Sequence, residues 1–218
     1  PWPSDLLTRV EAAARRLAAV APQVALDPIG ALSPALLPRT VRHRLGEFYT
    51  PPAIVSLALD RLGPEGCAGS LLDPTCGGGL FLVQAVARRR QAGPEGAPAE
   101  ALLAGLHGLD LQPMAVLASR AALALAVRGA PRARPLPLIE AIALGDVLTA
   151  PLPRADALVG NPPWVGWETL PASVREASAP LWRTHGLRVH GGMDVVLGKG
   201  RKELAALVLL RCLADGLR

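Results

Sequence analysis

The stretch that decides the fold is SLLDPTCGGGLFLVQAVARRRQ, residues 70–91. It starts with a short apolar segment that ends in Asp73 and has the length and composition of a strand. A tight turn with three successive glycines follows at 77–79, and residues 80–91 predict a helix. A strand, a glycine turn and a helix in this order are typical of an α/β domain.

The same alternation continues outward from this unit. Apolar segments typical of strands lie at 106–111, within 138–146 and at 155–161, and the patterns at 113–129 and 201–217 predict helices. Strands that alternate with helices form parallel sheets with helices on both faces, so we predict a doubly wound, mostly parallel sheet. Residues 165–200 are weakly periodic, and there we expect a long loop with at most a short helix around 171–178.

The chain before this alternation predicts a helical extension. Residues 4–21 have a serine cap and apolar residues at helical spacing, and we assign 1–45 to an N-terminal extension and 46–218 to the main domain. Within 46–62 a loop leads into a helix. Thr50 is the expected N-cap, because Pro51 and Pro52 suit the first turn of a helix.

Composition sets the broad class of the protein. The 218 residues are 50% hydrophobic and 19% charged, which indicates a globular chain, and the formal charge of +5 permits a nucleic-acid partner without requiring one. We find no membrane-spanning run and no secretory leader. The three cysteines, Cys67, Cys76 and Cys212, are too scattered for a zinc site and read as reduced thiols, so we expect a cytoplasmic protein without a metal.

Polar side chains follow each of the four expected strands: Asp73, Asp110, Asp146 and Asn161. In a doubly wound sheet ligands bind beyond the carboxyl ends of the strands, so this set predicts a binding site. The glycine turn is not a dinucleotide fingerprint, because Leu82 stands where the third glycine would be, and no phosphate-loop lysine follows. Asp110 is suited to accept ribose hydroxyls, which points to a nucleoside ligand without a pyrophosphate.

Five motifs, GEFYTP (46–51), DPTCGGGLFL (73–82), GLDL (108–111), GDVL (145–148) and LVGNPPWV (158–165), resemble those of the adenine-specific (N6-adenine) DNA methyltransferases of restriction–modification and phage-defence systems. The resemblance covers roughly residues 42–165 and, more loosely, the last helix. It implies the Rossmann-like fold of the class I methyltransferases, S-adenosyl-L-methionine as cofactor, and DNA with a flipped adenine as substrate. It also implies partner subunits of a defence or restriction system, and a catalytic domain truncated at its C-terminus, without a target-recognition domain.

The resemblance assigns roles to individual residues. The methionine end of the cofactor would be lined by Phe48, Tyr49 and Thr50, and the turn beneath it would be formed by Asp73, Cys76, Gly77 and Gly79. Asp110 would accept the ribose hydroxyls and Asp146 the adenine amine of the cofactor. The catalytic motif would be Asn161, Pro162, Pro163 and Trp164, with tryptophan where tyrosine or phenylalanine is commoner in the family.

The chemistry of an adenine amine accounts for these residue types. Its lone pair is delocalised into the ring, so it is a poor nucleophile. The side-chain oxygen of Asn161 and the carbonyl of Pro162 can accept its two N–H groups, which favours a more nucleophilic nitrogen as charge develops. The prolines fix the turn, and Trp164 offers a face for a base that has left the duplex.

Other functions remain open at this stage. Protein-glutamine and ribosomal-RNA amino-methyltransferases share an Asn-Pro-Pro-aromatic motif, although GEFYTP argues against them. A non-catalytic module that binds cofactor or DNA within a defence complex is a second alternative.

Several residues have no assigned role. Trp167 and Trp182 fit either a site or the packing of a loop, and His185 and His190 are expected to face solvent. Arg88–Arg90 suit the end of a helix, whereas Arg128, Arg132 and Arg134 lie in a loop where phosphate contact is plausible.

Overall fold

The computed structural model describes residues 50–187 and 203–218, and the expected helix at 4–21 and the whole of the extension at 1–45 lie outside these ranges. The described chain holds one parallel sheet of four strands, β1 (Leu71–Asp73), β2 (Leu106–Asp110), β3 (Ile142–Leu144) and β4 (Ala157–Leu158). Their order is β3-β2-β1-β4. The chain builds outward from β1 to β3 and then returns to the other side of β1, so the sheet is doubly wound as predicted, with its switch point between β1 and β4.

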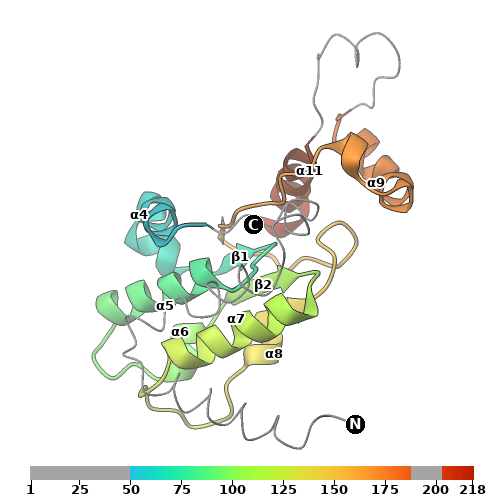
Figure 1. Ribbon diagram of the computed structural model, residues 1–218. Helices are drawn as coiled ribbons and strands as arrows, with labels where there is room; N and C mark the ends of the chain where they lie inside the picture. The colour runs from blue at the N-terminus through green and yellow to red at the C-terminus, as the bar shows by residue number, and fades with distance from the viewer. Residues whose placement is uncertain (1–49, 188–202) are drawn as a thin grey trace, which may run out of the picture.

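One face of the sheet is covered by α4 (Pro52–Ala68), α5 (Leu80–Ala92) and α7 (Pro113–Ala126). Figure 1 shows α5 and α7 side by side in front of the strands, with the short α6 (Ala99–Leu103) and α8 (Leu138–Ala141) below them. Leu71, Leu106 and Ile142 point from three strands into this layer and are at most 1% exposed. This core fixes α5, and therefore the glycine turn that precedes α5, against the strand ends.

The opposite face carries a second core beneath α9 (Ala172–Thr184) and α11 (Leu204–Arg211). Leu109 of β2 and Leu158 of β4 contribute to this core, because side chains alternate between the faces along a strand. The chain then passes through the short turn η2 (Cys212–Gly216) and returns to the sheet, where the Arg218 N–H donates to the Ala155 carbonyl at 3.0 Å. Residues 203–218 are therefore anchored to the same sheet as the glycine turn.

The element boundaries differ from the sequence expectation in two places where helix replaces an irregular or extended assignment. Residues 138–141 form α8 and only 142–144 form β3, because Leu, Glu and Ala are good helix formers and the Ala141 N–H reaches the Pro137 carbonyl at 2.9 Å. The five-residue α6 was not predicted. It is too short to show a helical period in the sequence.

Residues 166–187 contain more regular structure than predicted, and the rest of the expected loop, 188–200, lies outside the described residues. Instead of a short helix near 171–178, α9 has 13 residues and is preceded by the 3-10 turn η1 (Trp167–Thr169). Only Ser178 and Trp182 of α9 are buried, four residues apart, so the buried stripe of this helix is narrow. Tertiary packing of Trp182, which is 0% exposed, determines this helix.

Two further elements have boundaries that differ from the predicted ones. α4 continues past residue 62 to Ala68 across a bend at Gly63, whose φ of 70° is left-handed. β4 is shorter than the expected 155–161. No helix in the described ranges is both long and apolar enough to span a membrane.

Candidate functional site

The candidate site lies at the switch point, where the ends of β1 and β4 meet. Asp73 is the last residue of β1, and Gly160 and Asn161 follow β4. Gly160 has a φ of +149°, and a Cβ built there would lie 2.6 Å from Asp73 Oδ1. Only a residue without a side chain lets the two segments approach this closely. The sequence analysis did not single out Gly160, although it directly precedes Asn161.

Asp73 is a buried acid at the base of this site, only 1% exposed. Its pKa is raised to about 8, mainly by burial and to a smaller extent by the nearby Asp110 carboxylate, against the opposing effect of the Thr75 N–H, which donates to Oδ1 at 3.2 Å. A carboxyl group with this pKa is protonated at neutral pH, and a cationic ligand beside it would favour the ionised form.

The glycine turn bends around Cys76, whose N–H donates to the Leu109 carbonyl at 2.9 Å and so attaches the turn to β2. Gly79 has a φ of +82°, and a Cβ there would be 2.8 Å from Ser119 Cβ, so α5 packs tightly on α7 at this point. Gly77, with a φ of +52°, has open space where a Cβ would be. Cys76 is buried and burial raises the pKa of its thiol well above the usual range, as expected for a packing cysteine.

Asp110 joins the end of β2 to the glycine turn. Its Oδ2 accepts the Gly77 N–H at 2.8 Å, and its Oδ1 accepts the Gln112 N–H at 2.8 Å. Burial raises the pKa of this carboxyl group, while these backbone bonds oppose the shift. The structure thus brings Asp110, Gly77 and Asp73 together.

Asp146 lies one strand further out. The Gly145 N–H donates to the Asp110 backbone carbonyl at 2.9 Å, and the Asp146 Oδ1 accepts the Leu148 N–H at 2.8 Å. The second bond is that of a carboxylate that closes its own turn. Asp146 therefore stands at the same edge of the sheet, beyond β3.

Asn161 is where three of the sequence motifs converge. Its Nδ2 donates to Thr50 Oγ1 at 3.1 Å, its Oδ1 accepts the Trp164 Nε1–H at 2.7 Å, and its backbone carbonyl accepts the Thr75 hydroxyl at 3.2 Å. GEFYTP, DPTC and NPPW thus meet around one amide. Thr75 is a second residue that the sequence analysis did not single out, although it lies inside the DPTC motif.

The expectation that Thr50 caps α4 was wrong. α4 starts at Pro52 with Pro51 at its N-cap, and the N–H groups of Ile54 and Val55 reach the Pro51 carbonyl at 2.9 and 3.2 Å. The Thr50 side chain faces Asn161 instead. Phe48, Tyr49 and His190 lie outside the described residues.

The Asn-Pro-Pro-Trp motif is attached to the rest of the fold downstream of Asn161. The Val165 N–H donates to the Pro163 carbonyl at 3.1 Å, and the Val165 carbonyl accepts the Leu204 N–H at 2.8 Å, which attaches the motif to the start of α11. Pro162 and Pro163 are half-buried, whereas Trp164 is 53% exposed. An exposed aromatic ring beside a fixed amide offers a stacking face at the mouth of the site.

Trp167 and Trp182 serve packing in this structure. Their rings are 5.1 Å apart and cross edge to face at 78°, and Trp182 lies in the second core, where its indole N–H is buried without a partner in the described chain. His185 is half-buried after the end of α9.

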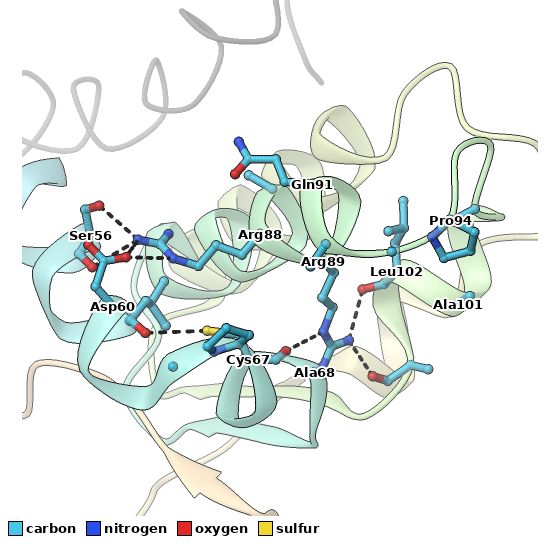
Figure 2. Close-up of a pocket in the computed structure, with 18 residues that line it drawn as sticks. Ser56, Asp60, Cys67, Ala68, Arg88, Arg89, Gln91, Pro94, Ala101 and Leu102 are labelled. Atoms are coloured by element: carbon cyan, nitrogen blue, oxygen red, sulfur yellow. Dashed lines mark hydrogen bonds and ion pairs between the residues drawn. The ribbon is translucent and has the colours of Figure 1, made fainter.

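Arg88, Arg89 and Arg90 lie at the opposite end of the sheet, because α5 runs back from the glycine turn to Ala92. A pocket of about 890 Å³ lies there. Figure 2 shows its lining residues, with Arg88 directed at Asp60 and Ser56 and Arg89 directed at backbone carbonyls. Arg90 bonds the Ala126 carbonyl at 3.0 Å. All three residues thus tie helices together. The loop with Arg128, Arg132 and Arg134 follows α7 and also lies at the end remote from Asn161.

Comparison with known proteins identifies the family to which the chain belongs. The family model for N-6 DNA methylase matches residues 37–188. The type I restriction enzyme MjaIX methylase subunit of Methanocaldococcus jannaschii is 36% identical over 85 residues, which is 39% of this chain and 14% of that subunit. The matched segment thus spans a small part of that relative.

Among solved structures, a modification subunit ascribed to a type I restriction enzyme of Vibrio vulnificus YJ016 matches with a TM-score of 0.44 and 24% identity. The match covers 72% of this chain and 33% of that one. The family model covers most of the described residues, including β1 to β4 and Asn161. The chain belongs to the N-6 DNA methylase family.

Proposed function

We propose that residues 46–218 form the catalytic domain of an S-adenosylmethionine-dependent DNA methyltransferase that acts on the exocyclic amine of adenine. The observation that carries this proposal is the placement of Asn161 at the switch point of the sheet, held by Thr50 and Thr75 beside the buried Asp73. Family membership supports the same reaction. The motifs for cofactor and catalysis meet at one end of one sheet.

The residues at this end suit S-adenosylmethionine. The ligand carries two cationic groups and several hydroxyl and amine donors, and the described residues nearest the switch point offer the carboxyl groups of Asp73 and Asp110. Gly77 leaves open space in the turn. Asp110 would hold the ribose, Asp146 the adenine, and Asp73 with the glycine turn the methionine end, together with Phe48, Tyr49 and Thr50. When bound, this cofactor supplies a methyl group activated on a sulfonium.

The chain's own part in the reaction is to prepare the amine. Asn161 Oδ1 and the Pro162 carbonyl accept the two N–H groups of the target amine and favour the nitrogen that carries a developing positive charge. Pro162 and Pro163 keep these acceptors in place, so little reorganisation is needed. Trp164 holds the extruded base by stacking, and no covalent intermediate with the protein is required.

Partners follow from the relatives. The two reported relatives are named as methylase and modification subunits of type I restriction enzymes, and we propose that this chain likewise works with restriction-system subunits in the cytoplasm.

The first experiment is calorimetric titration of the chain with S-adenosylmethionine, using Asp110→Asn as the test and Asp60→Asn, at the remote pocket, as the matched control. We expect saturable binding that weakens in the first variant only, because an amide in place of the Asp110 carboxylate is a poorer acceptor for two hydroxyls. Equal binding by both variants would place the cofactor elsewhere.

The second experiment is methyl transfer to duplex DNA, to RNA and to a glutamine-containing peptide. We expect DNA adenine to be the acceptor and Asn161→Ala to lower kcat by about 10²–10³-fold with unchanged cofactor binding. Transfer to RNA or peptide in preference to DNA would replace the proposed substrate, and cofactor binding without transfer to any of them would indicate a binding module.

A further inference from the structure

The side-chain amide of Asn161 is held at both of its ends. Thr50 Oγ1 lies 3.1 Å from Nδ2, and Trp164 Nε1 lies 2.7 Å from Oδ1. Trp164 is three residues further along the chain, beyond two prolines that fix the backbone between them. The second bond is therefore built into the local geometry of the motif.

The two bonds differ in what they can distinguish. A threonine hydroxyl both donates and accepts, so Thr50 would satisfy either end of an amide. An indole N–H only donates, so the atom opposite Trp164 Nε1 has to be the oxygen. Rotating the amide by 180° would set an NH₂ group against the indole N–H, donor against donor. Trp164 thus decides which way the Asn161 amide faces.

This orientation matters for the proposed reaction. The amide oxygen has two lone pairs and can accept the indole N–H and a substrate N–H together. The flipped amide would offer an NH₂ group to an amine that is itself a donor, and would give no help to the reacting nitrogen. The alternative aromatic residues do not provide the same control: phenylalanine has no donor, and a tyrosine hydroxyl both donates and accepts.

We propose that Trp164 is a positioning residue, whose indole N–H fixes the orientation of the Asn161 amide so that Oδ1 faces the target amine, in addition to the stacking that its ring provides. Its consequence for catalysis rests on the proposed function, whereas the bond itself does not. The motif couples the two tasks in one side chain, because the ring that receives the base also holds the acceptor in place.

The kinetic test uses Trp164→Phe, which keeps an aromatic face and removes the N–H. We expect kcat to fall about tenfold, the value of one hydrogen bond, with KM for DNA and Kd for S-adenosylmethionine changed less than twofold. Trp164→Ala also loses the stacking face, so KM should rise as well. Trp167→Phe, an indole of the packing pair, is the matched control and should behave as wild type. A wild-type kcat for Trp164→Phe overturns the proposal.

A nuclear magnetic resonance measurement tests the bond without any turnover. The indole ¹H–¹⁵N signal of Trp164, identified by its loss in Trp164→Phe, should exchange slowly with solvent for a half-exposed ring. In Asn161→Ala it should shift upfield and exchange several-fold faster. An unchanged signal overturns the proposal. If the chain transfers no methyl group, the proposed function fails, and this signal still reports whether Trp164 orients the amide.

Discussion

The two ends of the sheet each hold an ionisable side chain, fully buried at one end and half-buried at the other, and treat it in opposite ways. At the carboxyl end, Asp73 is 1% exposed, and its pKa is raised to about 8 by burial and by the nearby Asp110 carboxylate. At the other end, Arg89 lies among four backbone carbonyls, those of Cys67, Gly69, Leu102 and Ala104, at 2.6 to 3.0 Å. Burial lowers the pKa of this guanidinium, although the carbonyl groups around it accept its N–H groups.

The difference distinguishes a structural cation from an acid that we propose to be functional. The Arg89 donors are matched by carbonyls at the ends of α4 and α6, so the cation fastens two helices just before β1 and β2 begin. Asp73 faces a second acid and gains no cation from the described chain, so its ionised form is costly until a ligand supplies one. Groups with strongly shifted pKa values that lie in a cleft are candidates for function.

The largest effect that we expect concerns Asp73 and pH. Its pKa is about 8 in the folded chain and about 4 in an unfolded one, so the folded state holds one more proton between these values. The stability this proton provides is fully present below pH 4 and is lost as pH rises through 8, at about 1.4 kcal/mol per pH unit. Chemical denaturation should show this slope from pH 5 to about 8, and none above it, in wild type relative to Asp73→Asn. Parallel curves for the two proteins would remove the contrast with Arg89.

The next effect concerns Arg89→Ala, which strips four carbonyls of their partner. We expect the free energy of unfolding to fall by about 3 kcal/mol, with water from the adjacent pocket limiting the loss. Arg90→Ala, which removes one bond from an exposed side chain, should cost less than about 1 kcal/mol. Cofactor binding should be unchanged in both while they are folded. Equal stabilities of the two variants would mean that the Arg89 hydrogen bonds do not hold the two helices together.

A smaller effect tests how closely the strand ends approach at the switch point. Gly160→Ala places a Cβ 2.6 Å from Asp73 Oδ1 at a φ of +149°, and we expect a loss of about 2 kcal/mol in stability together with weaker cofactor binding. Gly129→Ala, at a φ of +78° with open space around it, should cost about 1 kcal/mol of backbone strain and leave binding intact. Thermal unfolding and calorimetry compare the two variants directly.

The smallest effect should come from Arg88→Gln. Arg88 bonds Asp60 Oδ1 at 2.6 Å and Ser56 Oγ at 2.9 Å, but the Asp60 side chain is 61% exposed. Exposed ion pairs contribute little, so we expect less than about 1 kcal/mol in the free energy of unfolding. A loss as large as that of Arg89→Ala would show that the pocket end depends on the ion pair rather than on the carbonyl bonds.

The sequence predicted the parts of this fold that repeat a simple pattern. The strand, glycine turn and helix at 70–91 and the helix from residue 113 were recognised because apolar residues and glycines mark them locally. The strand-end positions of Asp73 and Asp110 followed from the same pattern, and the structure places both beside the glycine turn. Resemblance of the motifs identified the family.

What the sequence could not show depends on contacts between distant segments. The local sequence predicts that Thr50 caps a helix. In the structure its hydroxyl oxygen accepts a hydrogen bond from Asn161, which is 111 positions away. The Trp182 side chain of α9 packs in a core that residues of α11 help to form, and this contact joins segments that are distant in the sequence. Gly160 carries no chemical group that would mark it in the sequence. Only the structure shows that Asp73 leaves no room for a side chain there.

The unequal exposure of the tryptophans gives the molecule an optical reporter. Trp164 is 53% exposed at the mouth of the site, and Trp182 is 0% exposed in the second core. Indole emission shifts to longer wavelength in water and is quenched by small solutes only when the ring is accessible. The emission lost in Trp164→Phe therefore reports the occupancy of the site, and the buried Trp182 supplies a steady reference within the same molecule.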